Sequence, residues 1–566
     1  MLKKTTSLLM ALLLCTALLL GCGQETTNSS QGDSSAESSS DAASSGADSG
    51  DSVSSYPLVD KTVTFNAVNT KSENVEESAA CKAYEEITNV HINWTYWSMN
   101  DFVQNLTLAV TADTVPDILF NMVSNGTQGC TPSQINQWGN AGYFVNYMDY
   151  EDLIPDVLAA LKESSRAAVS CYTDDGKMFL LPTWNWSYTG VGINLYYYTE
   201  LAKEIGYNAP PETIDEFYDM LVKAQAEFGA TDDEFYAYRA GSATAELEAN
   251  YVFTAFGDFV QTGYDSIDLK TVEYAGMSDQ MKAYLQFCAK CYAAGVIDPN
   301  CYSSDSTANA AAIKGMKCLV TPYQPFNYSW DTFNGVLTAD EISAYQEAGT
   351  FPLETMLPLT SDQDGKTIRV KNAVVGAGSN LCISSKCSDI ETAVKWMNGW
   401  YADDVGYEGW SHLSAWLGIE NVDWGYEDDA KTVYWTDKGD SEIGFSNAPN
   451  RVFYALPSAA NGNEGQHFYA AAQKVILDNY SMEPDEMFNV SMLTLNDDEN
   501  EVIASYGADI STYVKEAIPK FIMGVWNFDT DWTAYVAQLK TMGIEKCVAA
   551  YQAALDRYNE KWDQYR

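Results

Sequence analysis

Aromatic rings and amide groups alternate over a short stretch before residue 190. Trp184, Asn185 and Trp186 lie between Pro182 and Tyr188. The face of an indole packs against apolar C–H groups, and the amide between the two indoles can both donate and accept hydrogen bonds. A carbohydrate ring presents C–H faces bordered by hydroxyl groups, so this combination is typical of a sugar-binding site. Core packing is the alternative for each indole.

Two further segments carry aromatic and polar side chains together. Tyr323 and Gln324 follow the apolar run 316–320, which predicts a buried strand that would deliver them to a binding site. Trp410 lies within the segment 408–412, which is a third candidate. These residues, with the two indoles and the amide above, are the first candidates for direct ligand contact.

The elements that would position these residues are strands and helices in alternation. Residues 61–68 and 91–96 predict strands, residues 75–87 and 102–110 have apolar positions at helical spacing, and 117–120 predicts a short buried strand. This order is the signature of a mostly parallel sheet covered by helices, an α/β fold. Ligands of such sheets bind beyond the carboxyl ends of the strands, which makes two asparagines candidate contacts: Asn69 and Asn121.

The charge balance and the length of the chain narrow the class of protein. The chain has 78 acidic and 32 basic residues and a formal net charge of −46. Such a charge repels phosphate backbones, so we expect no nucleic-acid partner. The residues that follow the N-terminal segment described next, roughly 510, are too many for one hydrophobic core and predict two or three domains.

The N-terminal segment has the pattern of a lipoprotein signal peptide. Two lysines precede an apolar run over residues 8–20, and the sequence Leu-Leu-Gly ahead of Cys22 is a lipobox. We therefore expect a signal peptide over residues 1–21 and a lipid on Cys22, with acyl chains such as palmitate that anchor the protein to the cell membrane. Residues 22–55, rich in Ser and Asp, predict a disordered linker. An uncleaved N-terminal anchor is the alternative.

Cysteine and histidine usage gives no sign of a metal or cofactor site. Ten cysteines lie beyond residue 22, and we favour free, buried thiols because their spacing is unlike the dense framework of a disulfide-stapled domain. Cys288 and Cys291 form a CxxC pair, but their flanks predict an amphipathic helix. Zinc would need a second pair of ligands, and the sequence has only three histidines: His91, His412 and His467. We therefore expect no metal and no cofactor.

Several blocks in a fixed order resemble one protein family. The sequence FVQNLTLAVTADTVPDILF at residues 102–120 resembles the second helix and third strand of extracellular solute-binding proteins of ABC importers. The resemblance continues through nearly all of the chain beyond the linker, with blocks at residues 142–146, 175–182, 205–217, 281–299, 520–524 and 531–536. The last two blocks look like the subgroup of large lipoproteins that is oriented toward oligosaccharides. The order and spacing of the blocks together, rather than any single block, carry the resemblance.

The resemblance implies a periplasmic-binding-protein-like (type II) fold of two α/β lobes, with the ligand bound in the cleft between them. The implied division is a first lobe of residues 56–182 and 358–404 and a second lobe of residues 183–357 and 405–566. Closure of such lobes would be a hinge motion that buries the ligand. Some large relatives carry a calcium loop after the block at 214–217, whereas residues 228–234 lack the alternating oxygen ligands. We therefore expect no calcium there.

The resemblance also implies a function. We expect an extracytoplasmic binding protein rather than an enzyme, a monomer that captures a carbohydrate of oligosaccharide size and delivers it to the permease subunits of an ABC transporter. Two alternatives stay open. A peptide-binding protein of the same fold would need paired Arg and carboxylate groups for the peptide termini, and a surface glycoside hydrolase would need two carboxylates roughly 5–10 Å apart. No block ties two acidic residues to a common cleft, and no GxSxG motif is present.

Overall fold

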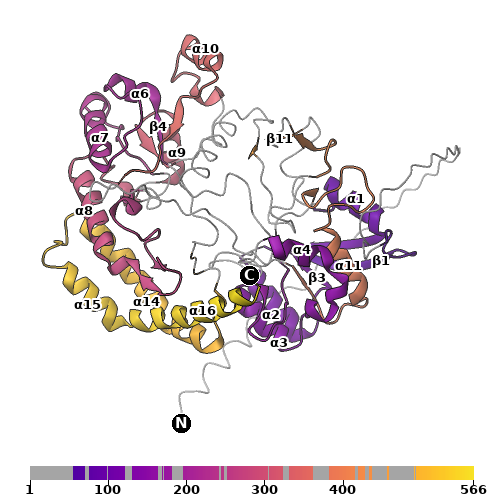
Figure 1. The fold of residues 1–566 in the computed structure, drawn as a ribbon. Coiled ribbons are helices and arrows are strands. Elements are labelled where there is room, and N and C mark those ends of the chain that lie inside the picture. The colour runs from indigo at the N-terminus through magenta and orange to yellow at the C-terminus, as the bar shows by residue number, and fades with distance from the viewer. Residues whose placement is uncertain are drawn as a thin grey trace, which may run out of the picture. The chain divides into compact units, whose positions relative to one another are not determined.

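The structure is a computed structural model of the whole chain, and its described residues are drawn in colour in Figure 1. The chain divides into the units Met1–Asp51 and Ser52–Arg566, and every described residue lies in the second unit. The described residues are 55–70, 75–98, 100–120, 130–163, 169, 171–181, 195–240, 244–247, 252–303, 305–322, 330–360, 381–414, 418–426, 432–435, 456–457, 488, 490 and 493–565. Cys22 and the predicted linker therefore lie outside them.

A four-stranded sheet in the order β2-β1-β3-β9 forms the centre of what we call the first lobe. β1 (Val63–Asn69) lies between β2 (Val90–Tyr96) and β3 (Ile118–Phe120) and is parallel to both. β9 (Leu381–Ile383) comes from much later in the chain and runs antiparallel to β3. The alternation of strands and helices predicted for residues 61–120 is thus confirmed.

The described helices of the first lobe come from the same two parts of the chain that supply its strands. They are α1 (Ala79–Thr88), α2 (Phe102–Ala112), α3 (Pro132–Asn140), α4 (Pro155–Glu163) and α11 (Ile390–Gly399), with the 3-10 helices η1 (Val75–Glu77) and η2 (Tyr147–Leu153). The helix predicted from residue 75 is regular only from residue 79, because the Ser78 hydroxyl accepts a hydrogen bond from the Cys81 amide and caps it there. Asn74, which directly precedes the predicted helix and is also a capping residue type, lies outside the described residues.

A second, three-stranded sheet in the order β7-β4-β8 forms the centre of the second lobe. β4 (Tyr196–Tyr198) is its middle strand and runs antiparallel to both β7 (Val320–Thr321) and β8 (Leu353–Thr355). The three tyrosines of β4 are buried, so this aromatic run forms core rather than ligand surface. The other elements of the second lobe are α6 (Thr199–Glu204), α7 (Ile214–Phe228), η4 (Phe253–Phe256), β5 (Tyr264–Asp265), β6 (Glu273–Tyr274), η5 (Ala275–Met277), α8 (Asp279–Ala293), η6 (Cys301–Ser303), α9 (Ser306–Lys314), η8 (Trp330–Phe333) and α10 (Ala339–Ala348).

Three helices end the chain: α14 (Asp497–Ile522), α15 (Trp532–Met542) and α16 (Ile544–Tyr565). The short strands β10 (Trp424–Tyr426), β11 (Thr432–Trp435) and β12 (Leu456–Pro457) precede them and form a third sheet. Among the helices of the described residues, none combines the length and the apolar character that crossing a membrane requires.

The hydrophobic cores follow the two main sheets, with one difference from the predicted division. The core around the first sheet includes Phe65, Tyr84 and Trp396, and the core around the second sheet includes Phe217 and Val320. Residues 405–419, which the sequence-based division assigned to the second lobe, contribute three side chains to the first core: Val405, Trp410 and Ile419. The second core also takes in α15, parts of α14 and the start of α16.

Candidate functional site

The carboxyl edge of the first sheet is where a ligand is expected, and Asn69 lies there. It is the last residue of β1, is 1% exposed, and its carbonyl accepts a hydrogen bond from the Trp97 amide at 2.9 Å. Beside it in the pairing register lies Tyr96, the last residue of β2, whose side chain is exposed. The edge therefore combines a buried amide with an exposed phenol.

Tyr96 is a candidate contact that the sequence analysis missed. Trp94 packs edge-on against Phe120 at 5.2 Å between ring centroids, and Trp97 is tilted against Phe102 at 5.6 Å. These two indoles therefore support the sheet, whereas Tyr96 is 39% exposed. The signal was present, because the predicted second strand ends at residue 96 and its last side chain must lie at the carboxyl edge.

The chain leaves the first sheet at this same edge. Leu181 pairs with Leu381, and Leu381 pairs with Phe120 at the end of β3. Residues 182–194, which follow Leu181, contain the predicted contacts Trp184, Asn185 and Trp186, and all three lie outside the described residues. Asn121 directly follows Phe120 and also lies outside them. The described neighbours of all four residues are nevertheless at the carboxyl edge.

The corresponding edge of the second sheet receives the chain. Tyr196 of β4 pairs with Thr321, the last residue of β7, and the Met356 amide donates a hydrogen bond to the Leu195 carbonyl at 2.8 Å. Leu181 and Leu195, the described residues on either side of 182–194, therefore lie at the carboxyl edge of the first sheet and beside the end of β7. Tyr323 and Gln324, two and three residues beyond Thr321, lie outside the described residues.

The second connection between the sheets joins the same two edges. β8 is parallel in direction to β7 because both are antiparallel to β4, so the chain leaves β8 at the edge that holds Thr321. It re-enters the first sheet at Leu381, beside Phe120. Two connections between the same pair of sheet edges are the topology of a ligand site at the junction of two α/β lobes.

Trp410 is placed differently from the other candidates. Its ring is 5% exposed, stacks on Tyr84 with 4.7 Å between centroids and an interplanar angle of 16°, and lies 5.3 Å from Trp400. Its indole nitrogen is buried and has no hydrogen-bond partner among the described residues. The structure gives this ring a packing role, and a ligand contact there stays a prediction.

Metal ligands do not gather in the part of the chain that the structure describes, where no group of three or more His, Cys, Asp or Glu side chains is arranged to hold an ion. In the segment where some relatives carry a calcium loop, the Asp232 carboxylate pairs with the Lys317 ammonium and accepts a hydrogen bond from the Glu234 amide. The hydrogen bond from Lys317 is the main cause that lowers the pKa of Asp232. This carboxylate is thus already engaged by a cation of the protein.

The sequence profile of bacterial extracellular solute-binding proteins matches residues 79–419, which include both connections, the second sheet and every strand of the first sheet except β1. The chain belongs to this family. A curated solute-binding protein that it resembles is the fructooligosaccharide ABC transporter substrate-binding protein FusA of Streptococcus pneumoniae, at 22% identity over 89% of this chain and 92% of the relative. A probable ABC transporter-binding protein of Deinococcus radiodurans is 38% identical over 16% of this chain and 20% of its own length.

Solved structures of solute-binding proteins share the fold. A binding protein from Bifidobacterium longum infantis, described as binding HMO and associated with an ABC transporter, superposes with a TM-score of 0.65 at 16% identity, covering 88% of this chain and 99% of its own. FusA of S. pneumoniae in complex with kestose gives a TM-score of 0.60 at 18% identity, covering 88% and 100%. This solute-binding protein therefore has the two-lobed type II fold, and its family places it outside the cytoplasm.

Proposed function

We propose that this solute-binding protein captures an oligosaccharide outside the cell and delivers it to the permease subunits of an ABC transporter. The observation that carries the proposal is the likeness to FusA, which extends over 89% of this chain and 92% of the relative. The likeness extends over most of both chains rather than over a single lobe, which supports a shared function. The named relatives are binding proteins, which supports a role in capture rather than catalysis.

The residues that we propose as ligand contacts belong to the two carboxyl edges or to the segments that directly follow them in the chain. Trp184, Asn185 and Trp186 follow the exit from the first sheet, and Tyr323 and Gln324 follow the end of β7. Asn69 and Asn121 complete the set at the first edge, together with Tyr96, which we add from the structure. Rings for stacking and amides for hydrogen bonding suit a neutral sugar.

The proposal includes a lipid anchor on Cys22 and a monomeric protein that works at the cell membrane. The Leu-Leu-Gly-Cys pattern after an apolar run supports it. Growth with an alkyne analogue of palmitate should label the wild-type chain, and Cys22→Ser should abolish the label and release the protein from the membrane fraction. Label retained by the serine variant would contradict the anchor.

The ligand class is tested by calorimetric titration of the unit Ser52–Arg566 with neutral oligosaccharides, beginning with kestose, and with short peptides as the comparison. We expect stoichiometric binding of a sugar that is recovered intact. Trp184→Ala should weaken this binding by about 1–3 kcal/mol, because a large stacked ring is lost from the site. The matched control is Tyr143→Ala, since Tyr143 lies near the Phe144–Ser384 bridge at the opposite edge of the first sheet.

Each other outcome of this titration has a separate meaning. Binding of peptides but of no sugar would keep the fold and assign a peptide ligand. Release of reducing ends during the titration would identify a glycoside hydrolase, which cleaves a glycosidic bond with two carboxylates. Equal affinity of the parent and the folded Trp184→Ala variant would remove this indole from the site.

The delivery step is tested by a separate experiment. A permease subunit should be recovered with the protein from detergent extracts only when the ligand is present.

A further inference from the structure

The last helices of the chain contact both lobes. α14 and α16 lie side by side, as Figure 1 shows. The first half of α16 contributes Ile544 and Cys547 to the second core. Its second half belongs to a different apolar cluster, in which Tyr558 and Trp562 pack with Val169, a residue that precedes the Leu181 exit from the first sheet. The helix pair is thus built into the second lobe and reaches the first.

Polar contacts join this helix pair to the first lobe in addition to the apolar contact with Val169. The Ser133 hydroxyl on α3 donates a hydrogen bond to the Leu495 carbonyl at 2.9 Å, and it accepts one from the Asn500 amide of α14 at 2.7 Å. Apolar cores hold elements together permanently, whereas polar contacts on a surface can exchange with water at small cost. The apolar attachment to the second lobe is therefore fixed, and the polar contacts with the first lobe are the part that can be made and broken.

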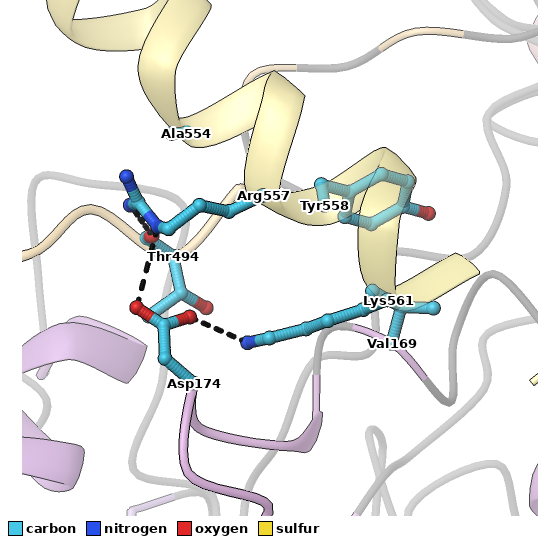
Figure 2. Close-up of a pocket in the computed structure, with 7 residues that line it drawn as sticks. All are labelled: Val169, Asp174, Thr494, Ala554, Arg557, Tyr558 and Lys561. Carbon is cyan, nitrogen blue, oxygen red and sulfur yellow. Dashed lines mark hydrogen bonds and ion pairs between the residues drawn. The ribbon is translucent and has the colours of Figure 1, made fainter. Parts of the chain in front are cut away.

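Asp174 is the centre of the charged part of this contact, shown in Figure 2. It lies in the turn that precedes Leu181, the residue that forms a β-bridge with Leu381. Its Oδ1 is 2.6 Å from Lys561 Nζ. Its Oδ2 is 3.2 Å from Arg557 Nε, a charge contact without hydrogen-bond geometry. Lys561 Nζ also donates a hydrogen bond to the Tyr172 carbonyl at 3.3 Å. We call Asp174, Arg557 and Lys561 the Asp174 clasp.

Arg557 is held in place independently of Asp174. Arg557 donates to both carboxylate oxygens of Glu499, at 2.5 and 2.6 Å, and to the Thr494 carbonyl at 3.2 Å. The hydrogen bonds to Glu499 are the main cause that raises the pKa of Arg557, so it stays charged. Glu499 is on α14, so these bonds do not involve the first lobe.

Exposure separates the two sides of the clasp. The Lys561 side chain is 16% exposed and that of Arg557 is 26% exposed, whereas the Asp174 side chain is 53% exposed. Arg557 is therefore preorganised on the C-terminal helices, and Asp174 is the more exposed partner, which water can solvate when the contact opens. A half-exposed ion pair is screened by salt, so the contact should weaken as ionic strength rises.

We propose that Asp174 is a positioning residue that sets the arrangement of the two lobes by docking on Arg557 and Lys561. A contact present in one arrangement and absent in another shifts the population toward the first. Ligand affinity then depends on the clasp, although none of its residues lies at the carboxyl edges. The inference rests on the two-lobed fold and does not depend on which ligand is bound.

The test measures the distance between the lobes without any ligand. Residues 22–566 carrying Cys22→Ser are spin-labelled at Leu108→Cys on α2 and at Val336→Cys after η8, two exposed positions away from the clasp. Distance distributions from pulsed electron resonance are compared at low salt and at about 0.5 M salt. The protein without the two introduced cysteines reports any labelling of native thiols.

At low salt the wild type should show one favoured distance between the labels. Asp174→Asn should lower the population of this distance, relative to all other distances, by about two- to fivefold. The distance distribution of the variant should then change little with salt. The matched control is Asp175→Asn. This neighbour pairs with Lys177 in the same turn at 2.6 Å, so the substitution removes an equal charge without touching the helices. It should leave the distribution as in the wild type. Thermal unfolding of each variant confirms that it is folded.

Exchanging the charges of Asp174 and Lys561 distinguishes a positioning role of this ion pair from a general loss of folding stability. Lys561→Asp should shift the distribution in the same way as Asp174→Asn, and Asp174→Lys combined with Lys561→Asp should restore part of the wild-type population. Lys561→Met keeps the apolar stem and serves if the charged variants do not fold. Coincident distributions for the wild type and Asp174→Asn at low salt, or an equal shift for Asp175→Asn, would overturn the proposal.

Discussion

At the scale of single residues, Gly399 shows how tightly the first core is packed. A methyl group at this last position of α11 would overlap the phenol oxygens of Tyr84 and Tyr56. Tyr84 cannot move away, because its ring stacks on Trp410 and its hydroxyl donates to the Trp396 carbonyl at 2.6 Å. The absence of a side chain at 399 is therefore required by packing rather than by backbone conformation.

We expect Gly399→Ala to lower the free energy of unfolding by about 1–3 kcal/mol, because overpacking a rigid core outweighs the gain in helix propensity. Urea unfolding followed by circular dichroism measures the change. Gly507→Ala in α14 is the control, since a methyl group there meets only Ile503 Cγ2 at 3.4 Å and should stabilise the protein by about 1 kcal/mol. A Gly399→Ala protein as stable as the parent would contradict this account.

The cysteines allow a second prediction at this scale. All ten that the structure describes are free, and nine of them are buried. Burial raises the pKa of Cys130 to about 12 and that of Cys387 to about 11, and the thiolate is the reactive form. The thiols of the unit Ser52–Arg566 should therefore react slowly with a disulfide reagent at pH 8. In denaturant all of them should become exposed and react together. Rapid reaction of the native protein would show an exposed thiol.

At the scale of elements, one carboxylate at the start of α14 has two roles. Glu499 accepts a hydrogen bond from the Asn496 amide at 2.9 Å in a capping box, and it binds Arg557 of α16. Its side chain is 9% exposed. The same residue thus caps the start of α14 and holds the neighbouring helix α16 through Arg557.

Glu499→Gln keeps an acceptor for the cap but removes the charge that faces Arg557. We expect a loss of about 1.5–3 kcal/mol in the free energy of unfolding, the range for hydrogen bonds to charged groups. Glu501→Gln, on the exposed side of the same helix, is the control and should change stability by less than about 0.5 kcal/mol. Equal stability of the two variants in urea would show that the Arg557 contact contributes nothing.

Element order could be predicted closely from the sequence, and exact helix starts could not. The second strand, predicted over 91–96, occupies Val90–Tyr96, because side-chain alternation reports its period directly. The start of α1 was placed four residues early, since Asn74 and Ser78 are both good capping types. Spacing alone does not say which of two caps accepts the first amide hydrogen bond.

At the scale of the whole molecule, strand direction made part of the candidate site predictable. Asn69 lies at the carboxyl edge because parallel strands in such alternation end at the same edge. The packing of Trp410 could not be predicted, because its partner Tyr84 is distant in sequence and only tertiary contact brings the rings together. For the same reason the sequence did not show that Val405, Trp410 and Ile419 pack in the first core.

The late strand β9 has a consequence for how the protein is made. It pairs with β3, and Leu381 can be supplied only after β4, β7 and β8 of the second lobe have all been synthesised. Until then the outer edge of β3 has no strand beside it, and an open strand edge invites pairing with other chains. Chains are made from the N-terminus, so the lobe that is first in the sequence is the last to complete its sheet. A nascent chain that stops inside the second lobe carries an unfinished first one.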